Sequence, residues 1–236
     1  MYVSRQHYID PKEAIEIARK IGVGELITYG SIGINATRLP FVIEERGGSL
    51  VLSTHMSRVN PQWRDEGEAL YVVGGPDAHV AGHYLPPESP TARMPLVPTW
   101  DYLTVHLRGK LSIYDDAAWK WAHVQRIVDH HELVWRPETH SQVERIERAF
   151  SALVGIELEI SEVLGKAKLH QNMSPADIAH IADNLAQNNA VDIAQLMHDI
   201  SIPWARERNE RITAAVKGKD PSHIEDLNPA HDEGSY

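Results

Sequence analysis

The chain has 236 residues, a formal net charge of −10 at pH 7 and 42% hydrophobic residues. It contains no cysteine, which excludes disulfides, thiolate nucleophiles, zinc–thiolate sites and iron–sulfur clusters. Since DNA binding depends on lysine and arginine neutralising phosphates, we do not expect so acidic a chain to bind nucleic acid directly.

The N-terminal twenty residues show no apolar run of the signal-peptide type. No stretch of the chain approaches the roughly 20 consecutive apolar residues that a membrane-spanning helix needs. The sequence therefore predicts a soluble, cytoplasmic protein with no membrane partner.

The first predicted element is a helix from Pro11 to about Gly22. Asp10 can cap this helix, and proline suits the first helical position because the N–H that it lacks would be unpaired there. Strands are predicted next, because segments rich in β-branched and aromatic residues alternate with Gly pairs and polar residues. They cover residues 25–30, 33–45, 49–59, 68–75 and 78–85.

Residues 85–98 contain five prolines, which predicts a loop. Apolar and polar side chains then alternate over 102–116 and again over 155–165, which indicates two long strands with one buried face each. Helices are predicted at 117–132, capped by Asp115 or Asp116, and at 138–152. Three more helices follow a Ser174 cap, at 175–188, 190–200 and 203–217, before a loose polar tail. This order favours an antiparallel sheet or barrel.

Four phrases carry a family resemblance: INATRLPF (34–41), THMSRVNPQW (54–63), VPTWDYLTVHLRGKL (97–111) and GKAKLHQNMSPAD (165–177). In this order they resemble the PaiB-like proteins, called FMN-binding negative transcriptional regulators. The resemblance implies an α+β protein, an antiparallel split β-barrel of the flavin-reductase and pyridoxamine-phosphate-oxidase type with peripheral and C-terminal helices. It implies a homodimer with flavin at the subunit interface. Residues 1–200 would form the barrel domain, and residues 201–236 a C-terminal helix and polar tail.

The chain departs from the family pattern inside these phrases. Arg38 stands where the family has His, Asp101 where it has Asn, and His83 where it has Trp. Ala167 and His170 replace Trp and Ser in the last phrase, and Ser57 and Val59 replace alanines in the second.

FMN needs cations and hydrogen-bond donors for its phosphate, and aromatic or polar neighbours for its ring. The cations could be Arg38, Arg58, Lys166 and Lys168; the donors Thr37, His55, Asn60, Gln62, Thr99, Gln171 and Asn172; and the aromatic neighbours Trp63 and Trp100. The competing interpretation is that these polar residues are simply solvated and the tryptophans belong to the core.

Haem is the alternative cofactor, because imidazole is a common axial ligand of haem iron. His83 or His170 would supply it, and the same cations could hold the propionates. Both could equally be ordinary hydrogen-bonded histidines. His130 and His131 are adjacent on a predicted helix and point to different faces, so we do not expect them to chelate a metal together.

The leading prediction is an FMN-dependent oxidoreductase that acts on a small or aromatic substrate, with Lys166 and Lys168 at the anionic end of the cofactor. The alternatives are a haem-dependent oxygenase or peroxidase-like enzyme, and a non-enzymatic regulator that keeps the fold. The sequence has no GxSxG, P-loop or GxGxxG motif to support a hydrolase, NTPase or Rossmann enzyme.

Overall fold

A computed structural model describes residues 1–31, 33–85, 96–131, 136–137 and 139–217. The described residues form two compact units. Unit 1 contains Met1–Ile9, Gly75–Leu103 and the chain from Lys166 onward, and unit 2 contains Asp10–Gly74 and Thr104–Gly165. Among these residues, no helix combines the length and the apolar character needed to cross a membrane.

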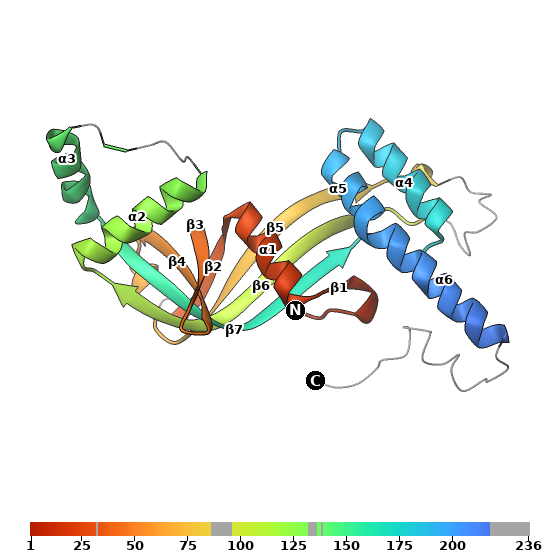
Figure 1. Cartoon of the computed structure of the whole chain (residues 1–236), viewed down its shortest axis with the longest axis horizontal. Coiled ribbons are helices and arrows are strands. Elements are labelled where there is room, and N and C mark those ends of the chain that lie inside the picture. Colours follow the sequence, from red (N-terminus) through yellow and green to blue (C-terminus); the bar gives the residue numbers. More distant parts are fainter. Residues whose placement is uncertain (32, 86–95, 132–135, 138, 218–236) are drawn as a thin grey trace. The chain divides into compact units, whose positions relative to one another are not determined.

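The described strands form a closed barrel. They are β1 (Tyr8–Ile9), β2 (Val23–Gly30), β3 (Gly33–Arg46), β4 (Ser49–Ser57), β5 (Glu68–Val80), β6 (Thr99–Tyr114) and β7 (Leu153–Lys168), labelled in Figure 1. Their order is β1-β7-β4-β3-β2-β5-β6, and β7 also pairs with β6, so that β2–β7 close on themselves. The pairs β2–β3, β2–β5, β3–β4 and β4–β7 are antiparallel. The predicted antiparallel split barrel is therefore confirmed.

Local signals place helix α1 (Pro11–Ile21) as predicted. The Asp10 carboxylate accepts a hydrogen bond from the backbone N–H of Lys12 at 2.9 Å, and Gly22 ends the helix with φ 65°. Glycine suits that left-handed conformation because it has no Cβ to clash. The helix buries Ala14, Ile15 and Ala18.

The predicted break between strands at 68–75 and 78–85 is wrong, because β5 is one continuous strand from Glu68 to Val80. A Cβ at Gly75 would lie 2.7 Å from the Leu103 side chain, so this glycine serves close packing. A short 3₁₀ helix, η3 (Gly82–Tyr84), follows the strand. Of the predicted proline-rich loop, residues 86–95 lie outside the described residues.

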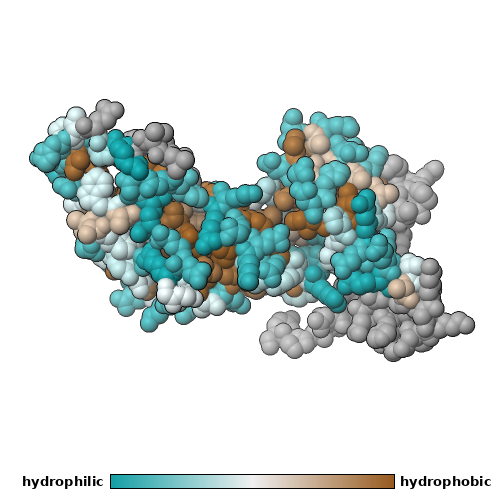
Figure 2. Space-filling view, in the orientation of Figure 1, coloured by the Kyte–Doolittle hydropathy of each residue, from teal (hydrophilic) through white to brown (hydrophobic). Residues whose placement is uncertain are grey.

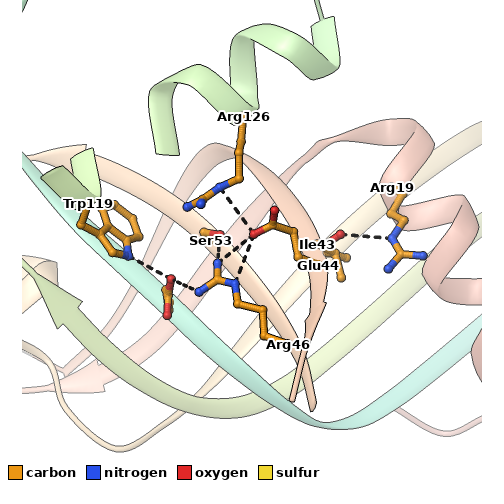
Figure 3. A network of polar contacts seen from close by, with 8 residues as sticks. Arg19, Ile43, Glu44, Arg46, Ser53, Trp119 and Arg126 are labelled. Atoms are coloured by element: carbon orange, nitrogen blue, oxygen red, sulfur yellow. Dashed lines mark hydrogen bonds and ion pairs between the residues drawn. The ribbon is translucent and has the colours of Figure 1, made fainter. Parts of the chain in front are cut away.

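Polar contacts attach helix α2 (Ala117–His131) to the barrel of unit 2 (Figure 3). Arg46 binds Glu157 at 2.7 Å and Glu44 at 2.9 Å. From α2, the indole N–H of Trp119 donates to Glu157 at 2.9 Å, and Arg126 lies 3.4 Å from Glu44. Positively and negatively charged side chains alternate in this network, so each buried or half-buried ion has a partner of opposite charge. Asp116 caps α2 by accepting from the Trp119 N–H at 2.7 Å. Helix α3 (His140–Phe150) follows.

The helices of unit 1 are α4 (Pro175–Gln187), α5 (Val191–Leu196) and α6 (Ile202–Lys217), with a π-helical turn, η4 (Met197–Ser201), before α6. The Ser174 hydroxyl caps α4 by accepting from the backbone N–H of Asp177 at 3.1 Å, as predicted. Ile178, Ile181 and Leu185 are fully buried. Figure 2 shows mainly hydrophilic side chains on the visible face of α6. The predicted helices 175–188 and 203–217 are confirmed within one residue. The predicted helix 190–200 corresponds to α5 and η4 together, which run into α6 without the expected break.

Candidate functional site

Unit 1 gathers titratable side chains where the start of β6 meets the end of β7. Asp101 on β6 is fully buried. Its Oδ2 lies 2.6 Å from Nδ1 of His170, and its Oδ1 lies 3.6 Å from Nζ of Lys168. A buried carboxylate needs such charged or hydrogen-bonding partners, because desolvation of an unpaired ion costs several kcal/mol. We call His7, Asp101, Lys166, Lys168 and His170 the Asp–His cluster.

The two lysines of the cluster alternate with the buried Ala167 on β7, and therefore project from the same face of the strand. Lys168 donates to the Thr99 hydroxyl at 2.8 Å and to the Trp100 carbonyl at 2.5 Å. Lys166 instead places its ammonium 5.5 Å from the ring centre of Tyr102, a cation–π contact. In the described part of the chain no carboxylate forms an ion pair with Lys166, so its charge is available to an anionic ligand.

His170 has an unusual backbone. Its φ is 59°, in the left-handed region that few residues other than glycine adopt. The residue begins the turn from β7 into α4, where its carbonyl accepts from the backbone N–H of Met173 at 3.0 Å. Such conformations are costly and often occur at functional sites.

The cluster changes the protonation of His7. Burial, and then the charges of Lys166 and Lys168, lower the pKa of His7 to about 4, against the opposing effect of Asp101. His7 is consequently neutral near pH 7. Its Nδ1 lies 3.0 Å from the Ser4 hydroxyl.

Several predicted FMN donors have structural partners in unit 2. Gln62 is 2% exposed, and its amide N–H groups donate to the carbonyls of Leu26 at 2.9 Å and Asn35 at 3.3 Å. The Thr37 hydroxyl donates to Gln62 Oε1 at 2.5 Å and accepts from the Asn60 amide at 3.0 Å. These contacts attach the 3₁₀ turn η2 (Pro61–Arg64) to β2 and β3.

The two predicted arginines also have acidic partners. Arg38 pairs with Glu25, its neighbour across β2–β3. Arg58 pairs with Asp115, and this hydrogen bond raises the pKa of the guanidinium. Arg58 also donates to the Ser151 carbonyl at 2.8 Å, while its own carbonyl accepts from the Trp63 indole at 3.0 Å.

The predicted donor His55 has a partner that sequence reasoning missed. Its Nδ1 lies 2.9 Å from Nε2 of His123 on α2. Burial lowers the pKa of His55; burial and then the neighbouring His55 lower the pKa of His123 to about 3. Trp119 stacks on the His123 ring at 4.9 Å between ring centres. Only the spacing of Trp119 and His123, one helical turn apart, could have indicated this contact.

The remaining predicted residues differ in exposure. His83 is exposed and packs edge-on against Tyr84. Gln171 is buried, accepts from the Leu169 N–H at 2.8 Å and donates to the Ala167 carbonyl at 2.6 Å. Asn172 is exposed.

Sequence reasoning did not select Asp101 or His7 as site residues. Asp101 and His170 both depart from the family pattern, and the structure places them in contact with each other. Two simultaneous differences from the family pattern, at Asp101 and His170, are the signal that could have identified Asp101. Within the described residues, no three His, Asp or Glu side chains are arranged to hold a metal ion.

The fold, together with a comparison with known protein families, defines the class of protein. Residues 1–162 match the family described as "Putative FMN-binding domain", and the chain belongs to this family. The predicted family is thus confirmed, and FMN is its cofactor. Lys166, Lys168 and His170 lie beyond the matched segment.

Relatives cover most of the chain. "Protease synthase and sporulation protein PAI 2" of Bacillus subtilis is 24% identical over 211 residues, which are 84% of this chain and 97% of that protein. An uncharacterized protein of Emericella nidulans is 26% identical over 215 residues, 75% of this chain and 83% of the relative. Among solved structures, a conserved hypothetical protein of Mycobacterium tuberculosis superposes with a TM-score of 0.50 at 9% identity. It covers 71% of this chain and 91% of its own length, and shows the fold alone.

Proposed function

We propose that the protein is a cytoplasmic, FMN-dependent oxidoreductase that acts on a small or aromatic substrate. The observation that carries this proposal is the ammonium of Lys166, which has no acidic partner in the described part of the chain and lies 5.5 Å from the ring centre of Tyr102 on β6. A point charge of this kind suits a phosphate. Trp100 is 54% exposed, so its ring is open to pack on a flat ligand.

The residues present fit FMN as follows. Lys166 would bind the phosphate, Lys168 would keep Thr99 and Trp100 in place, and Trp100 would contact the ring system. FMN, when bound, supplies the transfer of hydride or single electrons, while the protein binds and orients it.

Substitution of Lys166 by Ala is expected to weaken FMN binding about 10- to 100-fold, because a charge-assisted contact contributes roughly 1.5–3 kcal/mol. Flavin fluorescence in a titration of the apoprotein measures the affinity. Lys110→Ala is the matched control, since Lys110 is an exposed lysine on β6. Equal FMN affinity in Lys166→Ala and the control would refute this role of Lys166.

Haem binding is the second candidate, and the His170–Asp101 hydrogen bond favours it. Metal-ligating histidines commonly donate the N–H of their other ring nitrogen to a carboxylate. An absorption spectrum of the purified protein, before and after dithionite, separates the two cofactors. Flavin bands that bleach support the first proposal, whereas a Soret band that is lost in His170→Ala supports the second. A DNA-bound regulator is disfavoured by the net charge of −10.

We also propose that the protein is a homodimer. Tyr29 and Ile34 face each other in the β2–β3 register, and each is 76% exposed. Large apolar side chains exposed side by side are typical of interaction surfaces. Ile34→Asp is therefore expected to shift the protein toward monomer in sedimentation analysis. A dimer of unchanged stability in this variant would exclude Ile34 from the interface.

A further inference from the structure

The ring of His170 is held in one orientation by a buried carboxylate. Its side chain is 8% exposed, that of Asp101 is fully buried, and Nδ1 and Oδ2 lie 2.6 Å apart. A carboxylate can only accept a hydrogen bond, so Nδ1 of His170 carries the hydrogen. The neutral ring then has its lone pair on Nε2, and this nitrogen forms no hydrogen bond with any described residue.

We propose that His170 is a catalytic proton donor and acceptor, and that Asp101 is the positioning residue that sets its tautomer. The inference rests on the proposed flavin-dependent function and names a proton-transfer pair for it. His170 lies beyond residues 1–162, the segment that matches the family, whereas Asp101 lies within it.

The contacts of Asp101 agree with a positioning role. Oδ2 binds His170, whereas Oδ1 is buried and has no hydrogen-bond partner among the described residues. Lys168 is 3.6 Å from Oδ1 but gives its hydrogen bonds to Thr99 and Trp100. Lys168 therefore compensates the negative charge without competing for the oxygen that orients His170.

The surroundings of His170 suit a substrate on which negative charge develops during the reaction. The charged and titratable groups of the cluster come from three segments: His7 from the N-terminus, Asp101 from β6, and Lys166 and Lys168 from β7. Lys166 is assigned to the FMN phosphate. Lys168, 3.6 Å from the Asp101 carboxylate, is therefore the cation that would stabilise negative charge developing on the substrate.

The proton balance of a reduction shows what the pair would contribute. A quinone that accepted a hydride equivalent, which FMN would supply when bound and reduced, would gain two electrons and one hydrogen and would become an anion. The N–H bond at Nε2 of protonated His170 then breaks, an O–H bond forms on the quinone oxygen, and the product is a neutral hydroquinone. The imidazole keeps its Nδ1–H bond to Asp101, and water returns the proton to Nε2. Proton transfer of this kind contributes typically 10²- to 10⁴-fold to a rate.

The first test is nitrogen-15 NMR of the His170 ring in the full chain without added cofactor. We expect the hydrogen on Nδ1 in the wild type and a shift of the tautomer population in Asp101→Asn, because the amide of Asn can donate to Nδ1. A wild-type ring with its hydrogen on Nε2 alone would overturn the inference. This measurement does not require the protein to bind FMN.

The second test uses FMN-loaded protein, reduced with dithionite and mixed with a naphthoquinone in a stopped-flow instrument. Reoxidation of the flavin is expected to be about 100-fold slower in Asp101→Asn and in His170→Gln. His180→Gln, which alters an exposed histidine on α4 of unit 1, should stay within about twofold of wild type. FMN affinity, measured alongside, should change little in all three variants.

The outcomes separate this inference from the proposed function. Normal FMN uptake, with reoxidation in Asp101→Asn and His170→Gln as fast as in the wild type, would overturn the proton-transfer role alone. Failure of the wild type to bind FMN would overturn the proposed function and the catalytic role of His170 with it. Ligation of haem iron by Nε2 of His170 would also overturn the catalytic role, since that nitrogen would have no free lone pair.

Discussion

Gly109→Ala is expected to destabilise the barrel of unit 2 by about 3 kcal/mol, at the upper end of the usual cost of overpacking. A Cβ at this position of β6 would lie 1.9 Å from the Glu159 carbonyl oxygen and 2.7 Å from its carbon. Both atoms belong to the backbone of β7. They cannot turn away as a side chain can, so one strand must shift.

Urea denaturation followed by circular dichroism measures this loss. Gly74→Ala is the matched control, because Gly74 also lies in a barrel strand but has no atom within 4 Å of its added Cβ. We expect the control to stay within about 1 kcal/mol of wild type. An unfolding free energy for Gly109→Ala that equals the control would show that β6 and β7 are not so closely packed there.

Acidification from pH 7 to pH 5 is expected to destabilise the protein through His123. This ring is fully buried against Trp119 and His55, and its pKa in the folded state is lowered to about 3 from an ordinary value of 6.5. The unfolded chain therefore binds one more proton than the folded chain between these two values. The contribution of His123 to the free energy of unfolding is fully present above about pH 6.5. It decreases as the pH falls, by about 1.4 kcal/mol per pH unit.

His123→Phe keeps an aromatic ring against Trp119 but cannot be protonated. Its unfolding free energy should therefore depend less steeply on pH between 7 and 5 than that of the wild type. Some dependence will remain, because burial also lowers the pKa of His55. His140→Gln serves as control, since His140 is 89% exposed. Parallel curves for wild type and His123→Phe would show that His123 does not titrate in this way.

The candidate site was predictable only in part, for reasons that differ between residues. Lys166 and Lys168 share one face because side chains alternate along a strand, and this follows from their spacing. The ion pairs of Arg38 and Arg58 could not be predicted from spacing, because their acidic partners Glu25 and Asp115 lie 13 and 57 residues away in the sequence. A local pattern contains no information on which charge will be nearest after folding.

The sequence by itself determined the local elements. The helix that begins after Asp10 and ends at Gly22, and the cap at Ser174, depend on residues within one turn of each other. The four sequence phrases that resemble the PaiB-like family added the prediction of a split barrel. Only the tertiary structure decided which side chains meet: the pairing of β6 with β7 brings Asp101 to His170 across 69 residues, and helix α2 brings His123 to His55 across 68. Such contacts depend on strand register and on the packing of a helix against the sheet, which many residues determine jointly, so no short pattern encodes them.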